Sequence, residues 1–212
     1  QGGSWRLDVA AGMPVSVGNP FAGNELEWFA ASPDRVRKPQ VRAEAAAAAL
    51  PEAADFLVIV HPTLAQASAD YVALQQSRGY RVAVVDTDAI YARLADHEPS
   101  ADAIRQFIRD THARSALKFV TLVGADTYDY RNLLGTGSIS YVPTHYLKTS
   151  AYIAQTPSDA LHADVDGDQV ADIAIGRIPA RTPDEMLRMT RKIRQLGART
   201  LDAALFVAGG DT

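Results

Sequence analysis

The sequence predicts an α/β fold in which a parallel-type sheet carries helices on both faces. Residues 56–60 are a continuous apolar run rich in β-branched residues, which matches a strand covered on both sides, and 81–86 and 119–124 are further largely apolar strand candidates. Segments with helical periodicity separate these runs, so that strand and helix alternate along the chain. This alternation favours right-handed crossovers and a parallel sheet between two layers of helices.

The first part of this pattern is a strand, a helix, a second strand and a short helix. Residues 56–60 form the first strand, and the segment 64–78 follows with apolar residues three and four positions apart. Gly79 is placed to end that helix. The second strand is expected at 81–86, and a short helix at 88–94.

A longer helix and two further strands follow. Ser100 is expected to cap a helix with one apolar face, and the third strand covers 119–124. Residues 125–160 are rich in Tyr and Gly and are expected to form a long irregular segment, which in a compact domain is usually functional. A fourth strand is expected at 172–176.

The last predicted helix has a clear start signal. Thr182 precedes Pro183, and Glu185 lies three residues after the threonine, which is a capping box with proline at the first helical position. The helix is expected to cover 183–196, and a further strand is expected at 201–207.

The first 54 residues differ from the rest of the chain. Gly, Pro and Asn interrupt residues 12–24, a short strand fits 26–30, and an alanine-rich stretch follows at 43–50. We therefore expect residues 1–54 to be a lead-in or the edge of a preceding domain, and residues 55–212 to form the α/β domain.

Composition excludes several classes of function. The net charge is −4, and the 21 basic and 25 acidic residues are mixed, so no basic stripe predicts a nucleic-acid partner. The apolar runs are too short to cross a bilayer, and no signal peptide opens the chain. The chain contains no cysteine, which excludes disulfides, thiolate metal sites and a cysteine nucleophile among its own residues.

The most specific local motif is an acidic loop. Aspartates occupy positions 1, 3, 5 and 9 of this loop, at Asp164, Asp166, Asp168 and Asp172, and the carbonyl of Val170 falls at position 7. Alternating carboxylates on a tight loop supply the oxygen ligands that calcium requires, although the glycine and the position-12 residue differ from a helix–loop–helix site. The alternative is an Asp-rich turn that satisfies its own backbone.

No complete catalytic motif is present. The chain has no glycine-rich phosphate loop and no Gly-x-Ser-x-Gly elbow. Asp86 and Asp126 follow strands but lack the context of a phosphoryl-transfer site. The chain has five histidines, and no two have helical metal-binding spacing: His61, His97, His112, His145 and His162. We interpret His61, at the end of the first strand, and His162, just before the acidic loop, as structural or surface residues.

Nine segments are informative through their order and spacing: 55–62, 77–82, 103–108, 120–126, 142–144, 158–159, the acidic loop, 172–179 and the helix 182–196. Together they resemble the gingipain-like cysteine peptidase domain over about residues 55–212. The resemblance implies a caspase-like three-layer sandwich, present here in part, and a secreted bacterial endopeptidase with a Cys–His dyad. Both dyad residues of that family lie in later loops, so no catalytic residue is assigned to this chain.

The resemblance also implies one substrate-binding residue. An acidic residue after Ser faces the specificity pocket in arginine-cleaving members of the family, and the corresponding position here is Asp159. The alternative is that Asp159 caps a turn or joins the calcium site.

Three hypotheses about function follow. The first is the N-terminal part of a secreted or cell-surface bacterial cysteine endopeptidase, inactive alone, whose partners are a protein or peptide substrate and the missing C-terminal half of the domain. The second is a non-catalytic, calcium-stabilised binding or assembly module with the same fold. The third is a metal-dependent hydrolase that uses the aspartates of the acidic loop directly, in which Asp166→Ala or Asp168→Ala abolishes activity.

Overall fold

The computed structural model describes residues 47–130, 132–153, 155–168 and 170–197. The chain divides into two units, Gln1–Arg42 and Ala43–Thr212, and the described residues all lie in the second. The strands expected at 26–30 and 201–207 lie outside the described residues, and the expected division after residue 54 stays a prediction.

Four parallel strands form the central sheet, in the order β2-β1-β3-β6. Val58 of β1 faces Val84 on one side and Thr121 on the other, so β1 lies inside the sheet and all five of its residues are buried. This burial explains the continuous apolar run, and the α/β fold class is confirmed. The strands are β1 (Phe56–Val60), β2 (Val82–Asp86), β3 (Phe119–Val123) and β6 (Ala174–Ile178).

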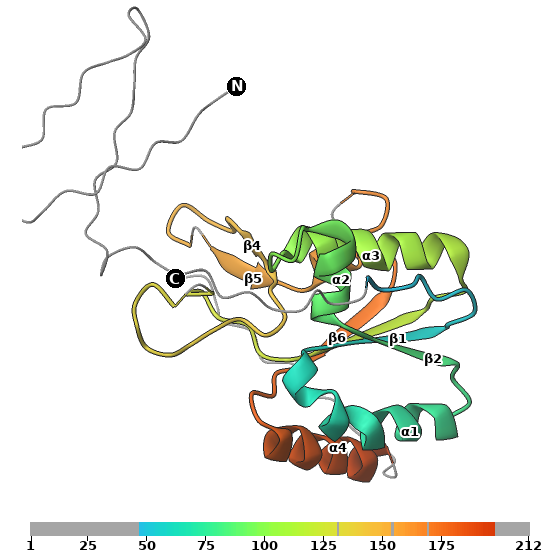
Figure 1. Ribbon diagram of the computed structural model, residues 1–212. Coiled ribbons are helices and arrows are strands. Elements are labelled where there is room, and N and C mark those ends of the chain that lie inside the picture. The colour runs from blue at the N-terminus through green and yellow to red at the C-terminus, as the bar shows by residue number, and fades with distance from the viewer. Residues whose placement is uncertain (1–46, 131, 154, 169, 198–212) are drawn as a thin grey trace, which may run out of the picture. The chain divides into compact units, whose positions relative to one another are not determined.

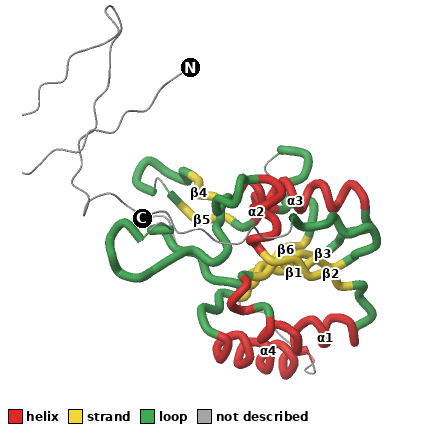
Figure 2. The backbone as a smooth tube through the Cα atoms, viewed as in Figure 1, coloured by secondary structure: helices red, strands yellow, loops and turns green. Residues whose placement is uncertain are grey.

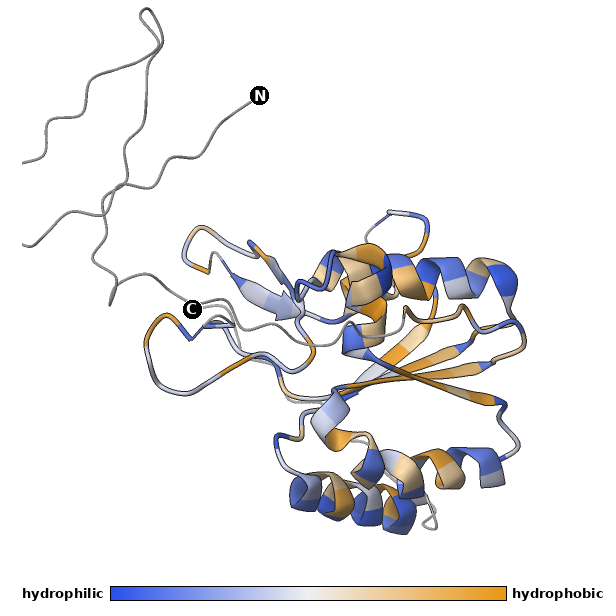
Figure 3. Ribbon diagram, viewed as in Figure 1, coloured by the Kyte–Doolittle hydropathy of each residue, from blue (hydrophilic) through white to orange (hydrophobic). Residues whose placement is uncertain are grey.

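Helices cover both faces of this sheet. In Figures 1 and 2, α2 (Thr87–Leu94) and α3 (Ala101–Arg114) lie on one side, and α1 (Ala69–Ser77) and α4 (Pro183–Gly197) on the other. The two layers create two cores, and Figure 3 shows apolar residues along the strands between them. Side chains of β1 alternate between these cores, as the period of a strand requires.

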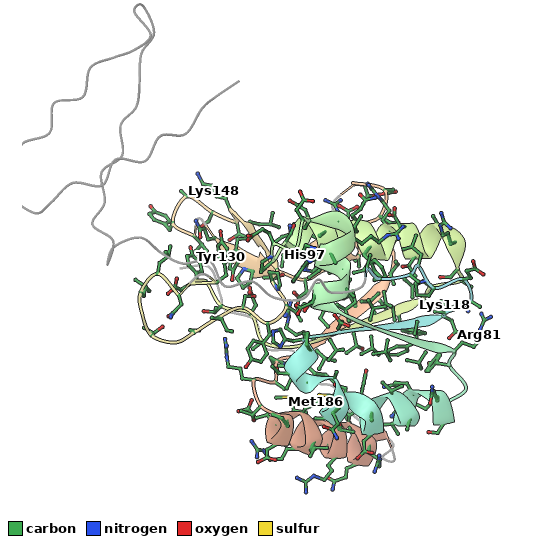
Figure 4. All side chains as sticks on the ribbon, in the orientation of Figure 1. Arg81, His97, Lys118, Tyr130, Lys148 and Met186 are labelled. Atoms are coloured by element: carbon green, nitrogen blue, oxygen red, sulfur yellow. The ribbon has the colours of Figure 1, made fainter. Side chains whose placement is uncertain are left out.

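The membership of the two cores follows this alternation. Leu57 and Ile59 meet the α2 and α3 layer, where Phe107 is fully buried. Val58 meets the opposite layer, where Met186 of α4 is fully buried beneath the sheet (Figure 4).

The first predicted helix is shorter than expected. Instead of one helix over 64–78, two 3-10 turns, Pro62–Leu64 and Gln66–Ser68, precede α1. The side chain of His61 caps the first turn by accepting from the Thr63 backbone N–H. The Ser68 hydroxyl donates to the carbonyl of Leu64 at 2.8 Å. These side-chain hydrogen bonds satisfy backbone groups locally, and the two 3-10 turns stand where the first turns of the helix were expected.

The irregular segment 125–160 contains a second, small sheet. Strand β4 (His145–Leu147) pairs antiparallel with β5 (Thr156–Ser158), and a 3-10 turn, Ala160–His162, follows. Three-residue strands are too short to show a period of two, which is why the sequence did not predict them.

The predicted caps of two helices, α3 and α4, are confirmed. The Ala103 N–H donates to Ser100 Oγ at 3.1 Å at the start of α3. At the start of α4, the Glu185 N–H donates to Thr182 Oγ1 and the Thr182 N–H donates to Glu185 Oε2, both at 3.2 Å. No helix in the described part of the chain is both long enough and apolar enough to cross a membrane.

Candidate functional site

The loops at the carboxyl edge of the parallel sheet form the candidate functional site, since this edge is where parallel α/β sheets bind ligands. His61 follows β1, Gly124 follows β3, and the segment 125–160 continues from there. The backbone of Tyr141 donates to the Ala125 carbonyl at 2.9 Å, which returns the long segment to the end of β3.

Arg177 of β6 connects four parts of this edge. Its Nη1 donates to the carbonyls of Gly124 and Val142, both at 2.7 Å. Its Nε and Nη2 donate to the two carboxylate oxygens of Asp159, at 2.8 and 2.6 Å. The side chain is only 13% exposed, so these bonds satisfy a largely buried cation. Arg177 therefore joins β6, the end of β3, the 141–144 loop and the segment that begins at Asp159.

Asp159, the predicted substrate-binding residue, accepts hydrogen bonds from two other residues of the protein, Arg177 and Thr144. Thr144 Oγ1 donates to Asp159 Oδ1 at 2.7 Å, in addition to the two bonds from Arg177. Burial raises the pKa of Asp159, but the hydrogen bonds and charge of Arg177 outweigh burial and hold it below its ordinary value. The carboxylate lies at the carboxyl edge of the sheet, where Arg177 stabilises its ionised form.

The end of β3 requires a glycine. Gly124 has a φ of +145°, and a Cβ at this position would lie 2.8 Å from Tyr141 Cβ and 2.9 Å from Val142 Cγ2. The 141–144 loop can approach the sheet because that atom is absent. The ring of Tyr141 in turn stacks on His61, with centroids 4.1 Å apart.

Two acidic residues at strand ends have structural partners. Asp126 accepts from Tyr146 Oη at 2.6 Å and from Ser140 Oγ at 2.5 Å. Burial and the hydrogen bond to Asp126 raise the pKa of Tyr146. Asp86 caps α2 by accepting from the Ala89 N–H at 2.8 Å. These contacts hold local loops in place, and neither carboxylate forms part of a phosphoryl-transfer motif.

The acidic loop brings three of its four aspartates together. One carboxylate oxygen from each of Asp164, Asp166 and Asp172 lies within 4.8 Å of the others. Asp168 is outside this group, and its carboxylate accepts from the Val170 N–H at 2.8 Å. Three converging carboxylates offer hard oxygen ligands to a divalent cation.

Asp164 is the buried member of this group. Its Oδ2 accepts from Arg105 Nη2 at 2.9 Å, and its Oδ1 accepts from the Gly167 N–H at 2.7 Å. Asp172 accepts from the Val165 N–H at 2.9 Å. These bonds fold the loop so that the carboxylates converge, and the Arg105 guanidinium offsets part of their negative charge.

Arg177 was not among the residues expected to form the site. Its signal is a single charge in the otherwise uncharged strand Ala-Ile-Gly-Arg-Ile, because a charge that becomes largely buried requires a partner. Thr144 and Tyr146 gave no such signal, since their partners, Asp159 and Asp126, lie 15 and 20 residues away.

Two solved structures share the fold. One is the crystal structure of dimeric latent PorU from Porphyromonas gingivalis, with a TM-score of 0.54 and 17% identity over 66% of this chain and 15% of that one. The other, described as the structure of a protease, has a TM-score of 0.51 and 21% identity over 66% of this chain and 27% of that one. The chain thus spans 15% of one neighbour and 27% of the other. No curated protein matches.

The family comparison covers both the sheet and its edge. The model of peptidase family C25 matches residues 49–212, which include all four strands of the sheet, Arg177, Asp159 and the acidic loop. The match covers most of the chain and agrees with the resemblance found in the sequence. The chain belongs to peptidase family C25.

Proposed function

We propose that this chain supplies the scaffold and one wall of the substrate cleft of a gingipain-like cysteine endopeptidase, as the N-terminal part of that enzyme. Its membership of peptidase family C25, over 49–212, carries this proposal. The chain contains no cysteine, and a cysteine peptidase attacks the peptide carbonyl with a thiolate. The nucleophile must therefore come from outside these residues, and the chain alone does not cleave peptides.

The proposed partners follow from this chemistry. The substrate is a protein or peptide, and the second partner is the remainder of the catalytic domain, which provides the cysteine and histidine. The resemblance to gingipains also supports a location outside the bacterial cell, in secreted or surface-bound form.

Asp159 contributes to the proposed cleft wall by holding Arg177 and the 141–144 loop. The two hydrogen bonds to Arg177 and the one from Thr144 support this indirect role over direct contact with a substrate guanidinium. An arginine side chain of a substrate would have to compete with a bidentate internal partner for the same two oxygens.

The coding sequence downstream of Thr212 tests the proposal. A histidine and then a cysteine, each in a loop after a further strand, would support the peptidase. A continuation that lacks either residue would contradict it and favour the second candidate below.

The second candidate is a non-catalytic assembly module, which exposed apolar side chains favour. Leu133 and Leu134 are 84% and 79% exposed, and Tyr152 is 97% exposed. Leu133 and Leu134 lie in the segment between β3 and β4, and Tyr152 lies between β4 and β5. Large exposed apolar side chains favour contact with another protein when they form one patch.

We also propose that the acidic loop binds calcium through Asp164, Asp166 and Asp172, with Asp168 or the Val170 carbonyl completing the shell after a local rearrangement. The converging carboxylates support the proposal. The bound ion would stabilise the loop that leads into β6, the strand that carries Arg177.

Calcium is expected to raise the melting temperature of the chain relative to excess chelator. A ligand that binds only the native state at 100 times its Kd adds about 2.7 kcal/mol to stability. The rise should disappear in Asp166→Asn and persist in Asp70→Asn, which changes an exposed aspartate on α1. Equal melting with calcium and chelator, checked by differential scanning calorimetry, would identify the loop as a self-satisfied turn.

A further inference from the structure

Two histidines from different segments lie in contact beside the candidate site. His145 begins β4, His162 ends the turn Ala160–His162, and their ring centroids are 4.7 Å apart with an interplanar angle of 53°. His162 is fully buried, and the side chain of His145 is 16% exposed. The contact brings together two imidazoles that are 17 positions apart in the sequence.

The hydrogen bonds of His162 fix its tautomer. Nε2 lies 3.1 Å from the carbonyl oxygen of Pro143, and because a carbonyl can only accept, Nε2 carries the proton. Nδ1 is therefore a bare lone pair. It is buried and has no hydrogen-bond partner among the described residues.

His145 has the complementary arrangement. Its Nδ1 lies 3.8 Å from Asp102 Oδ1, whose charge favours the tautomer with the proton on Nδ1. Its Nε2 is then a second bare lone pair, also buried and without a partner in the described part of the chain. Burial lowers the pKa of His145, so the ring is neutral near pH 7.

Two buried ring nitrogens without partners are costly unless a hydrogen-bond donor or a cation satisfies them. In metal sites, histidine ligands donate their other N–H to a carboxylate or a backbone carbonyl. His162 makes such a bond to the Pro143 carbonyl, and the Asp102 carboxylate lies 3.8 Å from His145 Nδ1. With metal–nitrogen bonds of about 2.0–2.1 Å, two imidazoles on a tetrahedral ion have centroids roughly 5 Å apart. The observed separation is close to that value.

We propose that His145 Nε2 and His162 Nδ1 form a two-histidine site for a borderline transition-metal ion such as Zn²⁺. Water or an exogenous ligand completes the coordination. The site is separate in chemistry from the acidic loop, because imidazole suits zinc, copper and nickel, whereas calcium requires oxygen. A bound ion would tie β4 to the 160–162 turn. This inference does not depend on the proposed peptidase function.

The charges around the pair set limits on affinity. Arg105 acts on His145 and Arg177 acts on His162, and both disfavour a further cation, whereas Asp102 and Asp159 favour it. With two protein ligands, the site should bind more weakly than a structural zinc site with four.

Zinc titration of the full 212-residue chain tests the proposal, with binding followed by equilibrium dialysis and by the visible absorption of Co²⁺. We expect one ion per chain and a melting temperature raised by about 5–10 °C at 100 times Kd. His145→Gln should abolish both signals. Asp102→Asn, at an exposed carboxylate, should weaken binding by about tenfold or more without unfolding the chain.

A matched control, His112→Gln, should bind zinc as the unchanged chain does. It replaces a histidine on α3 whose Nδ1 lies 3.2 Å from the Leu117 carbonyl. Asp166→Asn, in the acidic loop, reports whether that loop takes the ion. Zinc binding that survives in His145→Gln, or the absence of one-to-one binding in the unchanged chain, would overturn the proposal. Loss of binding in Asp166→Asn with retention in His145→Gln would assign the ion to the acidic loop instead.

Discussion

Replacing Arg177 by methionine is expected to destabilise the domain by about 3–5 kcal/mol, the usual loss when one partner of a buried ion pair is removed. Methionine preserves much of the side-chain volume but leaves Asp159 without its cation and two carbonyls without their donor. The loss also removes the side-chain link between β6 and the 141–144 loop, while the backbone pairing of β6 with β3 remains. Urea unfolding followed by circular dichroism measures the free energy of unfolding.

Arg188→Met is the matched control, since Arg188 is an exposed arginine on α4. It should change stability by less than about 0.5 kcal/mol. A double-mutant cycle of Arg177→Met with Asp159→Asn should show strong coupling. Equal effects of Arg177→Met and Arg188→Met would contradict the role assigned to Arg177.

The pair should also appear in the pH dependence of stability. Because the folded-state pKa of Asp159 lies below its unfolded value, its contribution is complete above the ordinary aspartate pKa of about 3.9. It is lost as the pH falls through the folded-state pKa. Arg177→Met should therefore lower stability at pH 7 more than at a pH below the folded-state pKa of Asp159, where the carboxyl is neutral.

Gly124→Ala is expected to destabilise the domain by about 3 kcal/mol or more, because it combines a strained backbone with overpacking. The added Cβ would lie under 3.0 Å from Tyr141 Cβ and Val142 Cγ2. Both atoms are close to their own backbone and cannot move away without it. Relief requires the 141–144 loop to move away from the sheet. That movement would weaken the Arg177 bond to the Val142 carbonyl.

Gly176→Ala is the control within the same sheet. Gly176 lies in β6, and a Cβ there would meet no atom within 4 Å. We expect its stability to equal that of the unchanged chain or exceed it slightly, by thermal and urea unfolding. A cost at Gly124 no larger than at Gly176 would show that the loop does not press against the end of β3.

The main strands and helices could be predicted from sequence because each has a long apolar pattern. The strand expected at 172–176 begins two residues later, at Ala174, since Asp172 closes the acidic loop by accepting from the Val165 N–H. The helix expected from Leu64 begins at Ala69, because side-chain bonds stabilise two 3-10 turns before it. Hydrogen bonds made by nearby polar side chains set these boundaries, and apolar periodicity does not reveal such bonds.

The candidate site was predictable only where its residues are close in sequence. Spacing grouped Asp164, Asp166 and Asp172, whose carboxylates converge in the structure, with Asp168, whose carboxylate accepts from the Val170 N–H instead. The pairing of Asp159 with Arg177 joins residues 18 positions apart in a β5–β6 connection that no periodicity describes. Such contacts depend on how the loops return to the sheet edge.

A peptidase assay of the purified chain tests the central claim most directly, that the scaffold lacks its own nucleophile. Fluorogenic arginyl and lysyl peptides and a protein substrate would be incubated with calcium, with and without iodoacetamide. The account predicts no hydrolysis above the blank and no effect of the thiol reagent, since the chain has no cysteine. Hydrolysis that co-purifies with the chain and is lost in Asp166→Ala would contradict it and establish a metal-dependent hydrolase.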